Sequence, residues 1–194
     1  SSYLGKNQFL VTQFIDGPDS NLYTFGSYSK SGKVVMEFTG RKLTQNPSFL
    51  GAVGIAEDIP SPRKIGEYSR KLIGEVGFSG ISQIEYKKNR ETDDYYLIEV
   101  NPRSWMWVYL ATVCGKNLPL AKYYTLTGRD ELIRSDKNKK RYLFIDEQSI
   151  LYNSLRERKV AWLFHILRRL FSHKYVFARY AHSDRGPFFR AFQG

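Results

Sequence analysis

The segment YYLIEVNPRSWMW, residues 95–107, decides the fold of this 194-residue chain. It alternates apolar and polar residues and then changes abruptly at an Asn-Pro-Arg turn. Successive side chains of a strand point to opposite faces, so Glu99 and Asn101 share one face. The apolar side chains on the other face are Tyr96, Ile98 and Val100. The pattern predicts a strand with one polar and one apolar face.

The turn after this strand carries a permanently charged side chain. Pro102 favours an extended conformation for the residue before it, so the strand geometry continues up to Asn101. Arg103 then places a planar guanidinium, which suits the oxygens of phosphates and carboxylates, at the end of the strand. The end of the strand is therefore a candidate anion site.

A hairpin partner for this strand lies directly upstream, in GISQIEYKK, residues 80–88, and the polar run RETDD suits the loop between them. One register of the hairpin pairs Asn89 with Tyr95. It places Glu85 opposite Glu99, and any even offset keeps both carboxylates on one face, whereas an odd slip separates them. Like charges that face each other across a ladder are unfavourable unless a cation lies between them, so the hairpin predicts a cation at this position.

The residues on this face have the chemistry of a metal site. Glu85, Glu99 and Asn101 supply only oxygen ligands, two of them anionic, and magnesium is usually held by one or two carboxylates together with substrate phosphates. Two acids, an amide and the nearby Arg103 therefore make a candidate site for a metal ion and a phosphate. The alternative is a solvated sheet face followed by an ordinary turn, and periodicity alone does not choose between the two.

The order Glu-x-Asn-Pro-Arg in residues 99–103 resembles the C-terminal part of an ATP-grasp domain. Such domains occur in carboxylate-amine ligases, among them enzymes of the D-alanine ligase type, in the large chain of carbamoyl phosphate synthase and in biotin carboxylase. The resemblance implies an α+β fold, in which an antiparallel sheet is backed by helices. It also implies ATP and Mg²⁺ as cofactors, with Mn²⁺ as an alternative ion. The implied metal ligands are Glu85, Glu99 and Asn101, and Arg103 is the implied contact to a phosphate or acyl phosphate.

A second resemblance lies upstream, in VTQFIDGPDSN, residues 11–21. It is similar to the hinge of ATP-grasp domains, where a strand binds the adenine edge and an acid beyond a turn binds the ribose hydroxyls. By position, Gln13, Phe14 and Ile15 are the implied adenine segment and Asp19 the implied ribose ligand. The alternatives are that Asp19 only forms a turn and that Phe14 is simply part of the core.

The segment FTGRKL, residues 38–43, ends another strand with two basic residues. The resemblance implies that Arg41 or Lys42 reaches the transferred phosphate or the substrate carboxylate, and the alternative is a solvated strand end. Trp105 and Trp107 are expected in the core rather than as a platform for substrate.

The rest of the first 128 residues predicts a mixture of strands and helices. Residues 9–15, 21–29 and 33–39 have strand patterns joined by turns, which predicts an antiparallel meander. Residues 45–62 lack a period and contain three prolines, so we expect an extended loop. A helix is predicted from Pro62 to Gly77, and two short helices that each end at a glycine are predicted after the aromatic run.

The C-terminal segment is markedly basic. Residues 1–150 contain 21 Lys and Arg against 17 Asp and Glu, whereas residues 151–194 contain 9 against 2. We expect residues 1–128 to be the C-terminal part of the ATP-grasp domain and residues 129–194 to be a basic, mostly helical extension packed on it. A helix over residues 161–171 is expected to bury its apolar side in the core. The alternatives are a helix at a membrane surface and a non-catalytic binding module, although no recognised nucleic-acid motif is present.

The remaining expectations concern the compartment and the complete enzyme. The single cysteine, Cys114, is expected to serve packing, and it fits a reducing compartment, so we expect a cytoplasmic protein. There is no recognisable signal peptide or transmembrane stretch. The resemblance covers about residues 9–126 and implies a preceding lid that binds phosphate. We therefore expect a C-terminal fragment of a longer ligase, inactive alone, whose partners are the N-terminal remainder, ATP, a small carboxylate and an amine acceptor. No nucleic-acid partner is expected, and association into an oligomer is left open.

Overall fold

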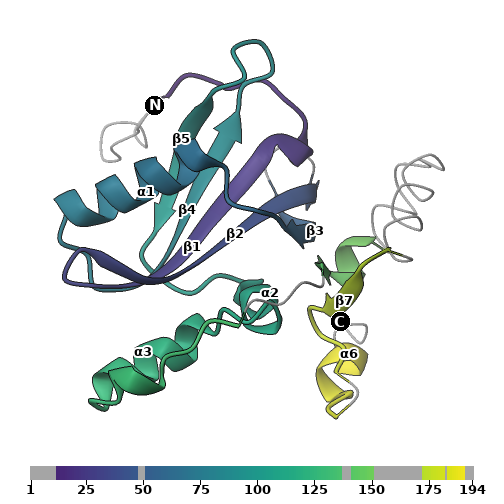
Figure 1. Ribbon diagram of the computed structural model, residues 1–194. Helices are drawn as coiled ribbons and strands as arrows, with labels where there is room; N and C mark the ends of the chain where they lie inside the picture. Colours follow the sequence, from purple (N-terminus) through teal and green to yellow (C-terminus); the bar gives the residue numbers. More distant parts are fainter. Residues whose placement is uncertain (1–11, 48–50, 137–140, 151–171, 182, 191–194) are drawn as a thin grey trace, which may run out of the picture.

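Seven strands form one sheet in the computed structural model, which describes residues 12–47, 51–136, 141–150, 172–181 and 183–190 (Figure 1). The order across the sheet is β5-β4-β1-β2-β3-β6-β7. Every neighbouring pair is antiparallel except β6 and β7, which run parallel. The strands are β1 (Leu22–Lys30), β2 (Lys33–Asn46), β3 (Ala52–Asp58), β4 (Gly80–Lys88), β5 (Tyr95–Asn101), β6 (Tyr142–Ile145) and β7 (Lys174–Phe177). The α+β fold predicted from the sequence is confirmed.

One face of the sheet is covered by helix α1 (Arg63–Glu75), which lies across β1 and β4 (Figure 1). Pro62 occupies the N-cap position, and Gly77 has a φ of +62°, which ends the helix as its sequence predicts. Ile65 and Ile73 are buried against Phe25 of β1. The helix predicted after Pro62 is therefore confirmed, and its apolar side forms the core of this face.

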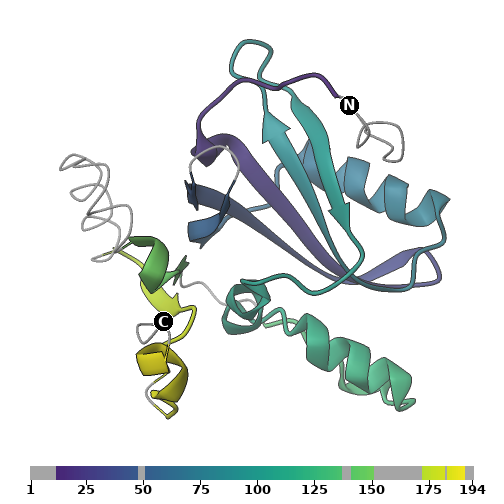
Figure 2. The ribbon, with the colours of Figure 1, turned by 180° about the vertical axis from the view of Figure 1, so that it is seen from behind.

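The opposite face is covered by helices α2 (Val108–Val113) and α3 (Leu118–Leu126), which Figure 2 presents from behind. Trp105 and Trp107 form the centre of this core, with exposed fractions of 5% and 2% and their rings in an edge-to-face contact. The two indoles pack directly on the backbone of β1 and β2, because Gly26 and Gly40 leave the space that a side chain would fill. Their predicted role in the core is confirmed.

Strand β3 is a correction to the sequence analysis, which predicts an extended loop over residues 45–62. The strand lies between β2 and β6, and residues on both of its faces are buried, so its sequence is apolar from Ala52 to Ala56 and lacks the alternation of a half-exposed strand. Its one glycine, Gly54, also weakens the pattern, although it is needed because a Cβ there would come within 2.7 Å of Thr44 Oγ1. The antiparallel meander consists of β1, β2 and β3.

The prediction of a strand at residues 9–15 is also wrong for residues 12–15, which the structure describes. Residues 12–18 carry no regular secondary structure, and the chain enters the sheet only after the 3₁₀ helix η1 (Asp19–Asn21). No strand among the described residues pairs with this segment, which explains why its alternating pattern does not become a strand. Residues 9–11 lie outside the described residues.

The described part of the extension contributes strands as well as helices. Strand β6, which the sequence analysis did not predict, pairs with β3, and β7 pairs with β6. The extension also contains the 3₁₀ helix η2 (Asp130–Leu132) and helix α6 (Gly186–Arg190). The predicted helix at residues 161–171 lies outside the described residues. None of the helices in the described ranges is long and apolar enough to cross a membrane.

Cys114 closes helix α2 and is packed against the core of the α2 face. Burial, together with the negative charge of Asp58, raises the pKa of its thiol to about 12. The thiol is therefore protonated at neutral pH, which confirms the structural role expected from the sequence.

The fit of the indoles against glycine can be tested by unfolding. Gly26→Ala would place a methyl group inside the Trp105 ring, and we expect it to lower the free energy of unfolding by about 1–3 kcal/mol. Gly74→Ala is the matched control in helix α1, where the new Cβ meets only ordinary contacts. It should leave stability unchanged or raise it by up to about 1 kcal/mol. Urea unfolding measures both, and equal effects would contradict this account of the packing.

Candidate functional site

The hairpin of β4 and β5 places two acids side by side. Glu85 is the direct partner of Glu99 in the ladder, and Gln83 is the partner of Asn101. Direct partners point to the same face of a sheet, so the two carboxylates and the amide share one face, as the sequence predicts. Further along the sheet, α2 and α3 cover this same face. Gln83 contacts Thr24 there, and Thr24 is two residues from Gly26, on which the Trp105 indole packs.

The register differs from the expected one at the loop end of the hairpin. Tyr95 pairs with Lys88 rather than with Asn89, and the ladder shifts by one residue next to Glu85. The extra residue is Ile98, which has no partner, so the structure contains a β-bulge at this point. The predicted pairing of the two acids is confirmed because the bulge absorbs the shift.

The bulge also corrects the predicted faces of β5. Tyr96 is opposite Lys87 and therefore shares the face of Glu99, whereas the sequence analysis placed Tyr96 on the apolar face. The strand lies at the edge of the sheet, and its apolar side chains remain well exposed. These are Tyr96, Leu97, Ile98 and Val100.

A buried ion pair lies at the centre of the site. The Lys42 ammonium is 2.9 Å from Oε1 and 3.0 Å from Oε2 of Glu85, and both residues are only 7% exposed. Gln83 donates from Nε2 to Oε1 of the same carboxylate over 2.8 Å. The two facing acids require a cation nearby, and the Lys42 ammonium is that cation for Glu85.

These side chains belong to a group of seven on one face of the sheet, which we call the polar cluster: Thr24, Lys42, Gln83, Glu85, Lys87, Glu99 and Asn101. Asn101 donates from Nδ2 to Gln83 Oε1 over 3.3 Å, and Gln83 is 3.4 Å from Thr24 Oγ1. Lys87 donates to the carbonyl oxygen of Pro18. Its pKa is lowered by burial and by nearby Lys42, against the opposing charges of Asp19 and Asp16.

Gln83 and Lys87 are members of the cluster that the sequence analysis missed. They flank Glu85 at two residues on either side, so the alternation of β4 already assigns them to its face. Applying the period of two to β4 as well as to β5 would have found both residues.

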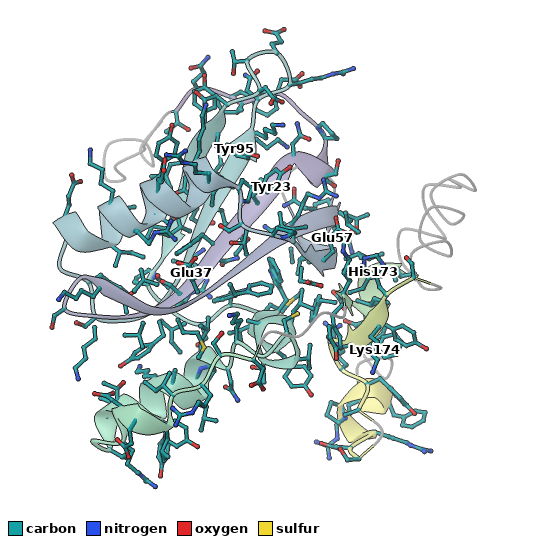
Figure 3. The ribbon with its side chains drawn as sticks, in the orientation of Figure 1. Tyr23, Glu37, Glu57, Tyr95, His173 and Lys174 are labelled. Atoms are coloured by element: carbon teal, nitrogen blue, oxygen red, sulfur yellow. The ribbon has the colours of Figure 1, made fainter. Side chains whose placement is uncertain are left out.

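Arg41 lies on the opposite face of the sheet from the polar cluster. Its Nε is 2.9 Å from Glu57 Oε1, and its Nη2 donates to the same oxygen. Burial lowers the pKa of Arg41, but the hydrogen bond and charge of Glu57, with a smaller contribution from Tyr23, outweigh it and raise the pKa. Glu57 Oε2 is also 4.0 Å from His173 Nε2, and Figure 3 places these two residues beside each other. Of the two basic residues at the end of FTGRKL, only Lys42 therefore joins the polar cluster.

The other predicted site residues lie around the cluster. Arg103 is exposed just beyond β5 and donates to the carbonyl oxygen of Ser104 over 3.2 Å. Gln13 and Phe14 are exposed, whereas Ile15 is buried. Asp19 accepts a hydrogen bond of 3.0 Å from the Gln45 backbone N–H, so it fastens the turn before β1 to β2. The proposed roles of these residues toward a nucleotide remain predictions.

Comparisons with known proteins agree with this architecture. D-aspartate ligase of Enterococcus faecium (strain Aus0004) is 24% identical over 115 residues, which are 58% of this chain. The biotin carboxylase subunit of pyruvate carboxylase superposes with a TM-score of 0.51 over 66% of the chain, at 18% identity. The complete pyruvate carboxylase of Rhizobium etli gives 0.50 over 63%, at 19% identity. The chain has an ATP-grasp fold.

The ATP-grasp resemblance of Glu-x-Asn-Pro-Arg is thus confirmed at the level of the fold. No model of a known protein family matches the chain. The matched region spans 27% of the D-aspartate ligase, 30% of the biotin carboxylase subunit and 12% of the R. etli enzyme.

The ATP-grasp metal ligands expected here form a set that fits Mg²⁺ held together with phosphates. Within the described ranges, no three side chains of His, Cys, Asp or Glu gather as a metal site. The cluster instead offers two carboxylates and one amide, and magnesium commonly takes one or two carboxylates and completes its shell with water and phosphate oxygens. Asn101 uses Nδ2 toward Gln83, which leaves Oδ1 as its potential ligand atom.

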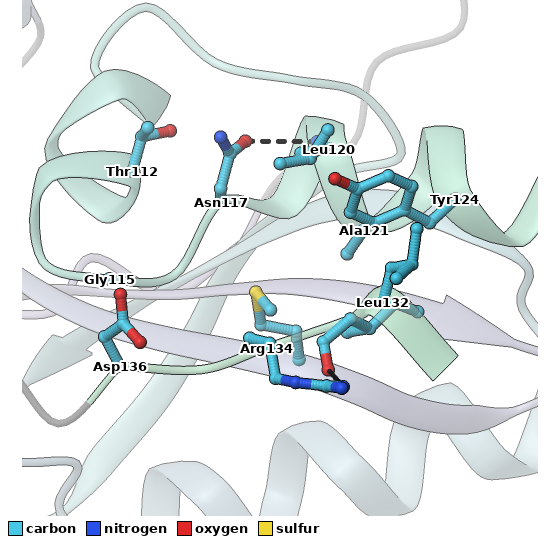
Figure 4. A pocket seen from close by; sticks show the side chains of 11 residues that line it. Thr112, Gly115, Asn117, Leu120, Ala121, Tyr124, Leu132, Arg134 and Asp136 are labelled. Atoms are coloured by element: carbon cyan, nitrogen blue, oxygen red, sulfur yellow. Dashed lines mark hydrogen bonds between the residues drawn. The ribbon is translucent and has the colours of Figure 1, made fainter. Parts of the chain in front are cut away.

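A separate cavity of about 370 Å³ lies between α2, α3 and the segment after η2 (Figure 4). It shares no residue with the polar cluster. Its charged residues Arg134 and Asp136 are both exposed, and Arg134 donates to the backbone carbonyls of Glu131 and Ile133. The cavity is therefore separate from the residues that the sequence analysis names as candidate metal ligands.

The buried pair on the α1 face can be compared with a surface pair. Glu57→Gln removes the charge that balances Arg41, and we expect it to lower the free energy of unfolding by about 1–3 kcal/mol. The matched control is Glu37→Gln, because Glu37 pairs with Arg70 at the surface (Figure 3). The control should cost less than about 1 kcal/mol. Chemical unfolding at neutral pH tests the difference, and equal losses would show that burial of Glu57 is unimportant.

Proposed function

We propose that the chain is the C-terminal part of an ATP- and magnesium-dependent ligase that joins a carboxylate to an amine. The observation that carries this proposal is the direct pairing of Glu85 with Glu99 on one face, next to Asn101 and Lys42. The similarity to D-aspartate ligase supports a carboxylate-amine ligase in particular. The identity of the carboxylate and of the amine is left open.

The proposed reaction has two steps. In the first, an oxygen of the substrate carboxylate attacks the γ-phosphorus of ATP, which forms an acyl phosphate and releases ADP. In the second, the amine nitrogen attacks the acyl carbon, the bond to phosphate breaks, and inorganic phosphate leaves with the proton that the nitrogen loses. Magnesium ions supply charge neutralisation at the phosphates when bound.

The residues of the cluster have distinct proposed roles. Glu85, Glu99 and Asn101 would hold the metal, with Mn²⁺ able to replace Mg²⁺. Arg103, which is exposed beyond the end of β5, would donate hydrogen bonds to the oxygens of the transferred phosphate. Lys42 would contribute positive charge at the phosphates from the opposite side of β1. Arg41 is held by Glu57 on the other face, which speaks against a direct catalytic role for it.

The nucleotide would bind along the segment that leads into β1. Gln13, Phe14 and Ile15 would line the adenine through their backbone groups, and Asp19 would face the ribose. This segment lies against β4, because Asn21 donates from Nδ2 to the carbonyl oxygen of Lys88 and Lys87 donates to Pro18. Its position supports a nucleotide whose base lies at the hinge and whose phosphates reach the cluster.

The metal site is tested by a charge-neutral substitution. Glu99→Gln keeps the shape of the side chain but removes an anionic ligand, and we expect it to weaken the binding of Mn²⁺ by about tenfold or more. The control is Glu91→Gln in the loop of the same hairpin, where Glu91 is exposed. Electron paramagnetic resonance of free Mn²⁺ measures both variants with and without ATP. Binding that is equally strong in Glu99→Gln and in the parent chain would rule out this site.

Whether these 194 residues are sufficient for ATP binding and for turnover can be tested directly. Because the matched region spans about a quarter of D-aspartate ligase, we expect weak binding of ATP and no turnover by this chain. Titration calorimetry with ATP and Mg²⁺ measures the affinity, and release of inorganic phosphate in the presence of carboxylates and amines measures turnover. Tight binding or product formation would contradict the expectation that the rest of the ligase is needed.

A further inference from the structure

The two facing carboxylates of the polar cluster are in different states. Glu85 is buried and has the Lys42 ammonium on both of its oxygens. The Glu99 side chain is exposed, and its carboxylate makes no hydrogen bond or ion pair with another residue in the described ranges. A cation that approaches this face therefore meets one open carboxylate and one that a lysine already neutralises.

The lysine reaches this position across a neighbouring strand. Strand β1 lies between β2 and β4, so the side chain of Lys42 must pass over β1 to reach Glu85. The residues there are small, since Thr24 pairs with Glu85 on one side and with Gly40 on the other. The contact is thus built into the register of three strands and does not depend on a loop.

Lysine suits a contact that is made and released. Its ammonium is a compact charge on a flexible stem of four carbons, whereas arginine would hold the carboxylate in a fixed fork. The register of β2 shifts directly after Lys42, and such irregularities in strands re-aim side chains near functional sites. A divalent ion that binds Glu85 would lie close to this ammonium, and like charges at such distances repel strongly.

We propose, on the basis of the proposed function, that Lys42 is the resident counter-ion of Glu85 and competes with the divalent metal for it. Without metal, the ammonium neutralises the buried carboxylate. When a metal ion binds with nucleotide, the ammonium leaves Glu85 and contacts the phosphate oxygens that accompany the ion. The contact of Lys42 with the phosphates would thus make metal binding depend on the nucleotide.

The proposal predicts that removal of the lysine charge strengthens the binding of metal alone. Lys42→Met keeps most of the stem and should bind Mn²⁺ about tenfold more tightly than the parent chain in the absence of nucleotide. Lys30→Met is the matched control, because Lys30 pairs with Asp130 at the surface and its loss changes the net charge equally. The control should bind Mn²⁺ like the parent chain. Electron paramagnetic resonance of free Mn²⁺ provides the measurement.

Two further variants make the result interpretable. Adding Glu85→Gln to Lys42→Met should remove the gain, since the carboxylate that the lysine had occupied is then lost. Lys42→Gln retains a hydrogen-bond donor for the buried Glu85 and should show the same gain, so it carries the test where Lys42→Met does not fold. Far-ultraviolet circular dichroism establishes folding in each case. Persistence of the gain in the doubly substituted chain would overturn the proposal.

The remaining outcomes separate this proposal from the proposed function. If both Lys42 variants bind Mn²⁺ no more tightly than the parent chain, while Glu99→Gln weakens binding, the metal site stands and the competition does not. If Glu99→Gln leaves Mn²⁺ binding unchanged in the parent chain and in the Lys42 variants, the ion binds elsewhere. The proposed function and the role of Lys42 then fail together.

Discussion

The pairing of β4 with β5 is the constraint on which the polar cluster depends. It sets Glu85 against Glu99 and Gln83 against Asn101, and Lys42 and Thr24 join the cluster through Glu85 and Gln83. A displacement of one residue along the whole hairpin would turn Glu99 toward the α1 face. The bulge at Ile98 confines such a displacement to the loop end, so the outer hairpin can follow its own register while the acids stay aligned.

Strand β2 divides its charge between the two faces of the sheet. Arg41 and Lys42 are consecutive, and each is balanced by a different acid, Glu57 on the α1 face and Glu85 on the opposite face. An isolated buried charge would be costly, so each face requires its own partner. The Arg41 pair joins β2 to β3 within the scaffold, whereas the Lys42 pair spans three strands and lies among residues with ligand chemistry. Two neighbouring basic residues thus differ in role because of the pleat alone.

The sequence predicts the local features of this fold well. The hairpin, helix α1 and the two short helices follow from patterns within a few residues. The expected register of the hairpin differs from the observed one at the loop end, and Glu85 pairs with Glu99 because the bulge at Ile98 absorbs the difference. Strand β3 escaped prediction because burial on both faces removes alternation. The bulge at Ile98 has no sequence signal of this kind, so Tyr96 was assigned to the wrong face.

The contacts that give the cluster its chemistry are harder to predict from sequence. The partner of Lys42 is 43 residues away, and the partner of Arg41 is 16 residues away. Both depend on which strands become neighbours, and not on any local pattern. The sequence therefore names Arg41 and Lys42 as candidate site residues, but it does not show which of the two lies beside Glu85.

The strand order has a consequence for how the cluster forms during folding. Strands β1 and β2 meet through a tight turn, but β4 joins β1 only after the chain has passed through β3 and α1. Gln83 and Thr24 are 59 residues apart, and closing so long a loop is slow relative to forming a hairpin. On a growing polypeptide, Lys42 would emerge long before its carboxylate partner. The site is thus completed late, and until then the polar face of β1 and β2 carries an uncompensated positive charge.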